Sequence, residues 1–240
     1  AQAFRHVFGD GIFAQPQQAF HRITYALQQF QLEEPDFHRY DSKYDLYLAN
    51  KVPLELAELR GLALFNDERK GNCAACHPSV RGEHGAPPLF TDFSFDNLGV
   101  PRNTRIPATA DATYFDLGLC GPDRTDLATK GDLCGAFKVP SLRNVATRQV
   151  FFHNGVFDNL TDALRFYVRR DTHPQEWYPR DKRGKVQKFN DLPAAYRANV
   201  NTREAPYDRK RGMAPALTPG EIDDVVKFLA TLTDGYQVQQ

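Results

Sequence analysis

The stretch GNCAACHPS, residues 71–79, determines how the rest of the chain is interpreted. Cys73 and Cys76 are separated by two residues, and His77 follows at once. With this spacing, two thiols can add to the vinyl groups of a haem while the imidazole meets its iron, so the run is typical of c-type haem attachment. The alternatives are chance, a redox dithiol, which favours a strand before the motif, and a zinc site, which requires two more ligands at short spacing. We therefore predict one covalent haem c per chain, with His77 as an iron ligand.

Composition limits the classes of function. The chain has 240 residues, 41% of them hydrophobic, and its 16 prolines and 16 glycines favour long ordered loops. Basic and acidic residues number 30 each, so no uniform positive field favours a nucleic acid or an anionic membrane as partner. No apolar run is long enough to predict a membrane span. The first residues lack the basic start and apolar stretch of a signal peptide, so we interpret the chain as mature and as part of something longer.

Hydrophobic spacing predicts helices separated by loops. The predicted helices cover residues 16–32, 52–67 and 159–170, and a last helix begins at residue 218. Pro53 suits the first turn of the second helix, and Gly61 would permit close approach of another backbone or a flat ring. Thr218 and Glu221 form the capping box of the last helix. Residues 78–158 are expected to be loops and short turns wrapped around something rigid.

The haem motif also predicts the redox compartment. Haem c is attached outside the cytoplasm, so we expect a periplasmic protein. There, Cys120 and Cys134 are best interpreted as a disulfide, with two free buried thiols as the alternative. Closing a loop of about 15 residues contributes roughly 3 kcal/mol in the chain-entropy model.

The second axial position of the iron decides between electron transfer and chemistry with peroxide or oxygen. Met213 is the only methionine and lies in GMAPALTPGEI, just before the last predicted helix. It is the candidate ligand, and an ordinary loop methionine is the alternative.

Four segments resemble a known family, and they occur in the order that this family has. They are LRGLALFNDERKGNCAACHPS (59–79), LFTDFSFDNLGVPRN (89–103), FKVPSLRNVATRQVFFHNG (137–155) and EIDDVVKFLATLTDGY (221–236). Together they resemble the C-terminal haem domain of the bacterial dihaem cytochrome c peroxidases, which include the MauG-like proteins. The first 50 residues resemble the end of that family's N-terminal domain. The resemblance implies a mainly α fold, with a cytochrome c-like haem domain over residues 52–240. Residues 1–51 would be helices of a truncated second cytochrome-like lobe.

Two departures from the family pattern concern the iron sites. Family members carry two C-x-x-C-H motifs, whereas this chain has one, so either a haem-bearing segment lies outside this chain or this is a one-haem relative. Many relatives place an axial methionine where this chain has Ala136. Met213, His153 or Tyr114 would then be the second ligand, or the site would be open.

The resemblance also suggests further site residues. Arg143 and Arg81 are expected to pair with the haem propionates, as are Lys138 and Arg148, and the alternative for each is a solvated loop charge. Phe93, with Phe90 and Phe95, is expected to line the haem pocket. The backbone carbonyls of Leu117 and Leu119 are candidates for a calcium ion of the kind that the family binds.

The function implied is a peroxidase-type oxidoreductase. Its haem would take electrons from a small periplasmic cytochrome c or copper protein and relay them for the reduction of hydrogen peroxide, with an absent N-terminal haem domain as a further partner. The alternative is a non-enzymatic c-type electron carrier or a subunit of a redox complex, which the single haem motif favours.

Overall fold

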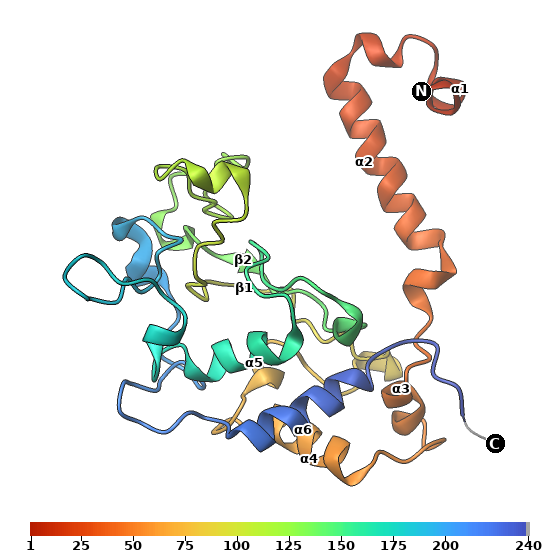
Figure 1. Cartoon of the computed structure of the whole chain (residues 1–240). Helices are drawn as coiled ribbons and strands as arrows, with labels where there is room; N and C mark the ends of the chain where they lie inside the picture. Colours follow the sequence, from red (N-terminus) through yellow and green to blue (C-terminus); the bar gives the residue numbers. More distant parts are fainter. Residues whose placement is uncertain (239–240) are drawn as a thin grey trace. The chain divides into compact units, whose positions relative to one another are not determined.

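A computed structural model of the chain describes residues 1–238 (Figure 1). Its α-helices are α1 (Gln2–Phe8), α2 (Pro16–Glu33), α3 (Lys43–Leu48), α4 (Leu56–Asn66), α5 (Leu160–Arg169) and α6 (Pro219–Ala230), and its strands are β1 (Phe95–Asp96) and β2 (Phe137–Lys138). Short 3₁₀ turns lie between them, among them η3 (Cys73–Ala75), η8 (Pro174–Glu176) and η9 (Ala194–Asn199). The chain divides into two compact units, Ala1–Tyr40 and the part that begins at Asp41.

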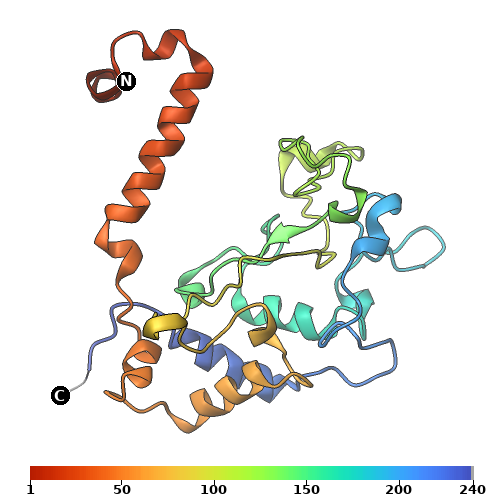
Figure 2. The ribbon, with the colours of Figure 1, turned by 180° about the vertical axis from the view of Figure 1, so that it is seen from behind.

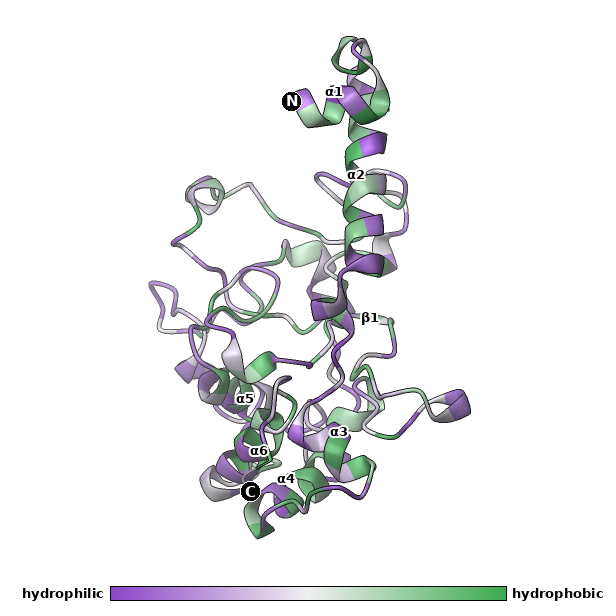
Figure 3. Ribbon diagram, turned by 90° about the vertical axis from the view of Figure 1, so that its right-hand side faces the viewer, coloured by the Kyte–Doolittle hydropathy of each residue, from purple (hydrophilic) through white to green (hydrophobic). Residues whose placement is uncertain are grey.

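The first unit consists of α1, α2 and the turns beside them. Pro16 occupies the first turn of α2, and the helix predicted over residues 16–32 is confirmed. Hydrophobic and hydrophilic bands alternate along α2 in Figure 3. Within this unit the apolar stripe of α2 is largely exposed, since Ala19 is buried but Phe20 and Leu27 are 68% and 54% exposed. The unit is held partly by ring contacts of Phe4.

In the second unit, α4 and α6 lie side by side in both views of the ribbon (Figures 1 and 2). Gly61 makes this contact possible, because a Cβ atom at residue 61 would lie 2.0 Å from the carbonyl oxygen of Asp224. The predicted close approach at Gly61 is therefore confirmed. The placement of Pro53 in the first turn is wrong: α4 begins only at Leu56, because Glu55 and Glu58 form the capping box that starts it.

The final helix begins as its sequence predicts. The side chain of Thr218 accepts the backbone N–H of Glu221, and the Glu221 carboxylate accepts the backbone N–H of Thr218 at 2.8 Å. Behind this cap, α6 buries an apolar face on the core. The buried residues of that face are Ile222, Val225, Phe228 and Leu229.

Aromatic rings from four segments form the centre of the core. Phe65 of α4 lies 5.2 Å from Phe228 of α6 between ring centroids, and Tyr44 of α3 lies 5.3 Å from Phe228. Phe90, from the loop after the haem motif, lies 5.6 Å from Tyr44. Helix α3 thus packs within the unit that begins at Asp41, and the domain boundary at residues 51/52 stays a prediction.

The long loops cover the region between these helices and carry little regular structure. Strands β1 and β2 form a two-residue antiparallel ladder that pairs Phe95 with Lys138 and Asp96 with Phe137. Cys120 and Cys134 are joined in a disulfide, which closes the loop before β2. The mainly α fold with long loops is confirmed. None of the helices in residues 1–238 combines the length and the hydrophobicity that a bilayer crossing requires.

Candidate haem-binding site

The C-x-x-C-H loop follows α4 and is closed by backbone hydrogen bonds. Asn72 adopts the left-handed conformation, with φ of 49°, and leads into the 3₁₀ turn η3. The backbone N–H of His77 donates to the carbonyl oxygen of Cys73 at 2.9 Å. The backbone N–H of Asp92 donates to the carbonyl oxygen of Cys76 at 2.9 Å. These bonds hold both cysteines and the histidine in one rigid turn.

The imidazole of His77 is oriented by the backbone. Its Nδ1 lies 2.7 Å from the carbonyl oxygen of Phe90. A carbonyl only accepts, so Nδ1 carries the proton and Nε2 carries the free lone pair. Phe90 has a positive φ of 52°, with its ring in the core and its carbonyl facing His77. Burial lowers the pKa of His77, although the Phe90 carbonyl and Asp92 act to raise it, so the ring is neutral as an iron ligand must be.

The two cysteines of the motif are free thiols with raised pKa values. Burial raises the pKa of Cys73 to about 12 and that of Cys76 to about 11. A reactive redox dithiol has a lowered pKa, so these values disfavour the thioredoxin interpretation. Within residues 1–238, no group of three histidine, cysteine or acidic side chains is placed to hold a metal ion by itself, which disfavours the zinc interpretation.

The motif opens onto a cavity of about 580 Å³. This size is typical of a cofactor pocket. The walls come from the C-x-x-C-H loop, β2, the segment 150–153 and helix α5. Most of the lining is apolar: Phe65, Val100, Leu142, Val145, Leu160, Leu164, Leu217 and Leu229 all contribute. The cavity also has cations in its wall, Lys138 and Arg148.

The residues present fit a covalently bound haem c. Two thiols and one neutral imidazole lie at the wall of a single cavity, which is the donor set that the cofactor needs. The apolar walls suit a porphyrin, and Lys138 and Arg148 can balance carboxylates at its edge.

Five residues expected at the haem lie outside the described lining of this cavity: Arg81, Phe90, Phe93, Phe95 and Arg143. Phe90 is buried in the aromatic core, and Phe95 is 47% exposed. Arg81 is exposed and donates to the carbonyl oxygen of Gly85 at 2.8 Å. Phe93 is 57% exposed, with the Lys138 ammonium 4.8 Å from its ring centroid. Arg143 is largely buried elsewhere and is described next. Of the cations predicted to meet the propionates, the structure therefore brings Lys138 and Arg148 to the cavity, and not Arg81 or Arg143.

Arg143 has a structural position of its own. Its Nη2 lies 2.7 Å from Oδ1 of Asp45 and its Nη1 lies 2.9 Å from Oδ2 of the same carboxylate. Its Nε donates to the carbonyl oxygen of Pro88 at 3.0 Å. Burial acts to raise the pKa of Asp45, but the bonds from Arg143 and Ser42 hold that pKa below its ordinary value. Arg143 thus ties α3 to the loop that carries Phe90, the residue that orients His77.

Met213 and Tyr114 also lie outside the described lining of the cavity. Met213 is 46% exposed, and its sulfur accepts the backbone N–H of Lys210 at 3.3 Å. The carbonyl oxygen of Tyr114 accepts Nη2 of Arg102 at 2.8 Å. Ala136, at the position of the family's axial methionine, has no donor atom in its side chain. The structure therefore does not bring Met213, Tyr114 or Ala136 to the cavity that His77 lines.

His153 lines the cavity but is engaged by its neighbours. Its ring stacks on Phe137 with centroids 3.6 Å apart and an angle of 6° between the planes. Its Nε2 lies 3.6 Å from Oδ2 of Asp191. This packing is that of a core histidine.

Tyr167, on α5, is the cavity residue whose possible role the sequence did not reveal. Its phenol lines the same cavity as His77, and burial raises its pKa well above the ordinary value. A phenol oxygen is an established axial ligand type for haem iron. In the sequence, Tyr167 is one member of the apolar stripe of α5. The signal was a hydroxyl on a stripe otherwise made of hydrocarbon side chains.

One of the two carbonyls predicted to bind calcium is already engaged by the backbone. The carbonyl oxygen of Leu117 already accepts the backbone N–H groups of Gly135 and Cys120, at 2.9 and 3.2 Å. The calcium ion stays a prediction.

Comparisons with known proteins support the interpretation of the site. No protein-family model matches the chain. The methylamine utilization protein MauG of Paracoccus denitrificans is 31% identical over 234 residues, which cover 96% of this chain and 56% of that protein. The cytochrome c551 peroxidase of Nitrosomonas europaea is 29% identical over 184 residues, covering 73% of this chain and 45% of that protein.

Solved structures match the fold as well. The crystal structure of the diheme peroxidase BthA from Burkholderia thailandensis superimposes with a TM-score of 0.83 at 40% identity, covering 98% of this chain and 56% of that one. The chain thus spans about half the length of these relatives. Sequence identity, coverage and fold agree, and the chain belongs to the family of MauG-like dihaem cytochrome c peroxidases.

Proposed function

We propose that this chain is the haem c-bearing, electron-transferring domain of a periplasmic peroxidase-type oxidoreductase. The observation that carries the proposal is the meeting of two free thiols and one neutral, backbone-oriented imidazole at the wall of a single apolar cavity. In this proposal residues 52–240 are the haem domain and residues 1–51 are the end of a second lobe. A second haem domain, as in the diheme peroxidase BthA, would be a partner of this chain.

Each residue has a defined role in the proposal. Cys73 and Cys76 would anchor the cofactor through thioethers, and His77 would hold the iron through Nε2. Tyr167, rather than Met213, would be the other residue to hold the iron, because it lines the cavity with His77 while Met213 is half exposed outside it. Haem c, when bound, supplies one-electron oxidation and reduction at its iron. The protein contributes the dry apolar wall and the fixed imidazole.

The periplasmic location and the donor are further parts of the proposal. A disulfide between Cys120 and Cys134 suits an oxidising compartment. A small cytochrome c is a proposed donor, as for the cytochrome c551 peroxidase of Nitrosomonas europaea, and a small copper protein is the other proposed donor. Reduction of hydrogen peroxide is proposed for the whole protein and not for this chain alone.

The test combines this chain with a donor. The haem-loaded chain is mixed in a stopped-flow instrument with a reduced small cytochrome c, and the full-length protein is then assayed for peroxide-dependent oxidation of that donor. We expect rapid reduction of the chain's haem and steady peroxide turnover by the full-length protein. The His77→Gly variant should lose the turnover. Equal turnover in the wild type and in this variant would contradict the proposal.

The single haem motif supports a second candidate, a non-enzymatic electron carrier. The two candidates are separated by the natural gene and by the same assay. A second C-x-x-C-H encoded before Ala1, with peroxide turnover, supports the enzyme. A gene without that motif, and a product that exchanges electrons but turns over no peroxide, supports the carrier.

A further inference from the structure

Residues 179–188 form a short hairpin in the second unit, seen as the open loop at the left of Figure 1. Arg180 and Val186 form an antiparallel bridge, and the backbone N–H of Gln187 donates to the carbonyl oxygen of Pro179 at 2.8 Å. The turn is built on Asp181. Its Oδ1 accepts the backbone N–H groups of residues 183 and 185, each at 2.9 Å. The carboxylate of Asp181 is thus hydrogen-bonded within the turn of the hairpin.

The tip of this hairpin is strongly cationic. Arg180, Lys182, Arg183 and Lys185 are all exposed. The ion pairs recorded within residues 1–238 give none of these four a carboxylate partner. The whole chain has a formal net charge of zero, so this is a local concentration of positive charge rather than a general property. Such a patch attracts a partner with an acidic surface.

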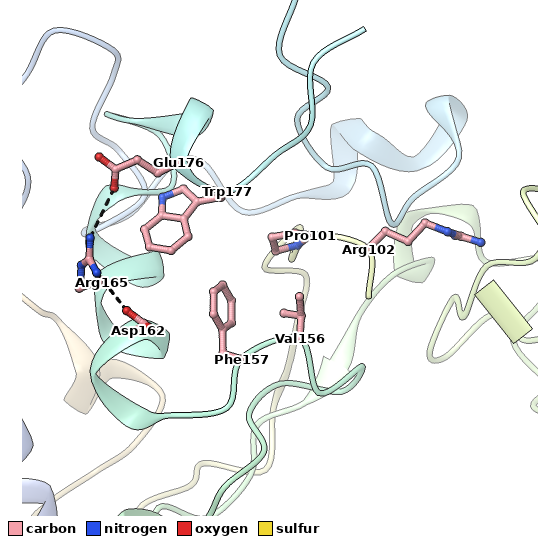
Figure 4. Close-up of a pocket in the computed structure, with 8 residues that line it drawn as sticks. All are labelled: Pro101, Arg102, Val156, Phe157, Asp162, Arg165, Glu176 and Trp177. Atoms are coloured by element: carbon pink, nitrogen blue, oxygen red, sulfur yellow. Dashed lines mark hydrogen bonds and ion pairs between the residues drawn. The ribbon is translucent and has the colours of Figure 1, made fainter. Parts of the chain in front are cut away.

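The residue that leads into the hairpin is Trp177. It lines a second cavity, of about 460 Å³, together with Arg165 and Glu176 (Figure 4). Arg165 lies 4.0 Å from Glu176, and its guanidinium lies 5.9 Å from the Trp177 ring centroid. An oxidisable indole therefore lies in the wall of a cavity that also holds charged side chains, next to the cationic hairpin.

Ring contacts join this indole to the haem-binding cavity. The Trp177 ring centroid lies 5.7 Å from that of Phe157 and 5.7 Å from that of Phe166. Phe152 lies 5.5 Å from Phe157 and 5.3 Å from Tyr167. Phe152 and Tyr167 both line the cavity of the candidate haem site. A continuous series of aromatic contacts thus links the second cavity to the first.

We propose that the hairpin is the docking surface for an acidic one-electron donor protein, and that Trp177 marks the point where its electron enters. The cations identify the partner's charge, and the aromatic series identifies it as a redox protein. The inference rests on the proposed function, because it needs haem c at Cys73 and Cys76.

The electron balance of this transfer is simple. The donor loses one electron and the haem c of this chain gains it; no bond forms or breaks. Among the described residues the Nε1–H of Trp177 has no hydrogen-bond acceptor, so no group is placed to take its proton. The electron therefore moves without a proton at this residue.

The docking surface is tested by binding. The haem-loaded chain is titrated calorimetrically with an acidic blue-copper protein at low and high ionic strength, with a basic blue-copper protein as comparison. The variant K182E/R183E should bind the acidic protein at least about tenfold more weakly, and added salt should weaken the wild type in the same way. K210E/R211E is the matched control: it changes the same residue types and the same net charge at exposed positions outside the hairpin, and should change binding less than about twofold.

Equal weakening in both double variants, tighter binding of the basic protein, or binding only to anionic phospholipid vesicles would overturn the docking surface. The entry point is tested at saturating donor, where Trp177→Leu should slow electron transfer at least about tenfold with an unchanged haem spectrum. An unchanged rate would overturn the role of Trp177. A wild-type chain that carries no covalent haem would instead contradict the proposed function.

Discussion

Single residues decide what the haem pocket can do, and His77 is the clearest case. Its ring is fixed by the Phe90 carbonyl and kept neutral by burial, so Nε2 is available to iron. Two residues are candidates for the other iron ligand. Tyr167 lies in the cavity, whereas Met213 is half exposed outside it.

Replacement of Tyr167 by phenylalanine tests this ligand directly. The change removes the phenol oxygen and keeps the ring contact with Phe152, so the fold should persist. We expect the optical spectrum of the oxidised haem to change to that of an open site that binds cyanide. Tyr207 is a second phenol in the lining of the same cavity, 6.0 Å from Tyr167 between ring centroids. Tyr207→Phe should leave the spectrum unchanged, and a change in this variant alone would assign the ligand to Tyr207. A spectrum that is unchanged by Tyr167→Phe but altered by Met213→Leu would identify Met213 as the ligand instead.

Asp45 gives stability that depends on pH. Its folded-state pKa is lowered by Arg143 and Ser42 in spite of burial, so its contribution is full above the unfolded pKa, about 3.9, and disappears as pH falls through the lower folded pKa. Asp45→Asn should therefore reduce the free energy of unfolding by about 2–3 kcal/mol at pH 7, and by much less at a pH below the lowered folded pKa. Urea unfolding of the haem-loaded protein over this pH range measures both values.

The exposed Asp223 on α6 supplies the control for this change. Asp223→Asn should alter the free energy of unfolding by less than about 0.5 kcal/mol. A constant effect of Asp45→Asn from pH 7 down to a pH below that folded pKa would show that the pair with Arg143 does not act through ionisation.

Among the elements, the contact between α4 and α6 stabilises the part of the core that lies next to the candidate haem site. Gly61 lets the backbone of α6 approach α4, and the two helices hold Phe65 and Phe228 against Phe90. The same α4 leads into the C-x-x-C-H loop. An error in this contact is therefore expected to disturb both stability and haem attachment.

Gly61→Ala should destabilise the protein by about 2–4 kcal/mol, because the new Cβ would lie 2.0 Å from the carbonyl oxygen of Asp224. Gly220→Ala, in helix α6 itself, is the matched control, since a Cβ atom at residue 220 would meet no atom within 4 Å. It should be neutral or slightly stabilising, as alanine favours helices. Thermal unfolding of both variants measures the difference, and equal melting temperatures would contradict the close packing.

The disulfide is an element-scale link as well. Cys120 and Cys134 close the loop that leads into β2, whose Phe137 and Lys138 line the haem cavity. The double variant C120S/C134S should lose about 3 kcal/mol of stability. Thiol titration of the unfolded wild-type protein without reductant provides the check: reactive thiols at these two positions would mean that no disulfide forms.

The elements that the sequence predicts well are those with local signals. The capping box at Thr218 depends on a neighbour three positions away, and the close approach at Gly61 depends on the small size of glycine. Both predictions are confirmed. The start of α4 was misplaced because a capping pair at Glu55 outweighs the preference of Pro53 for a first turn.

At the scale of the whole molecule, the haem-attachment motif can be predicted from the sequence because covalent attachment requires a fixed local spacing of two cysteines and a histidine. The lining of the cavity cannot be predicted in this way, because it depends on packing between segments that are distant in the sequence. Tyr167 reaches the cavity from α5, about 90 residues after the motif, and the same position in the sequence looks like ordinary helix packing. Arg143 stands beside a family motif, yet it pairs with Asp45 from α3. Such partners are fixed only when distant segments meet.

The central claim is that one haem is bound to Cys73 and Cys76 through thioether bonds, and the intact mass of the denatured protein tests it most directly. The chain is produced with the cell's c-type haem attachment machinery, denatured in acidic organic solvent and weighed by mass spectrometry. We expect the 27.2 kDa polypeptide plus the mass of one haem, and only the polypeptide mass in the variant C73A/C76A. A wild-type protein that releases its pigment into the solvent and shows the bare polypeptide mass would contradict the account.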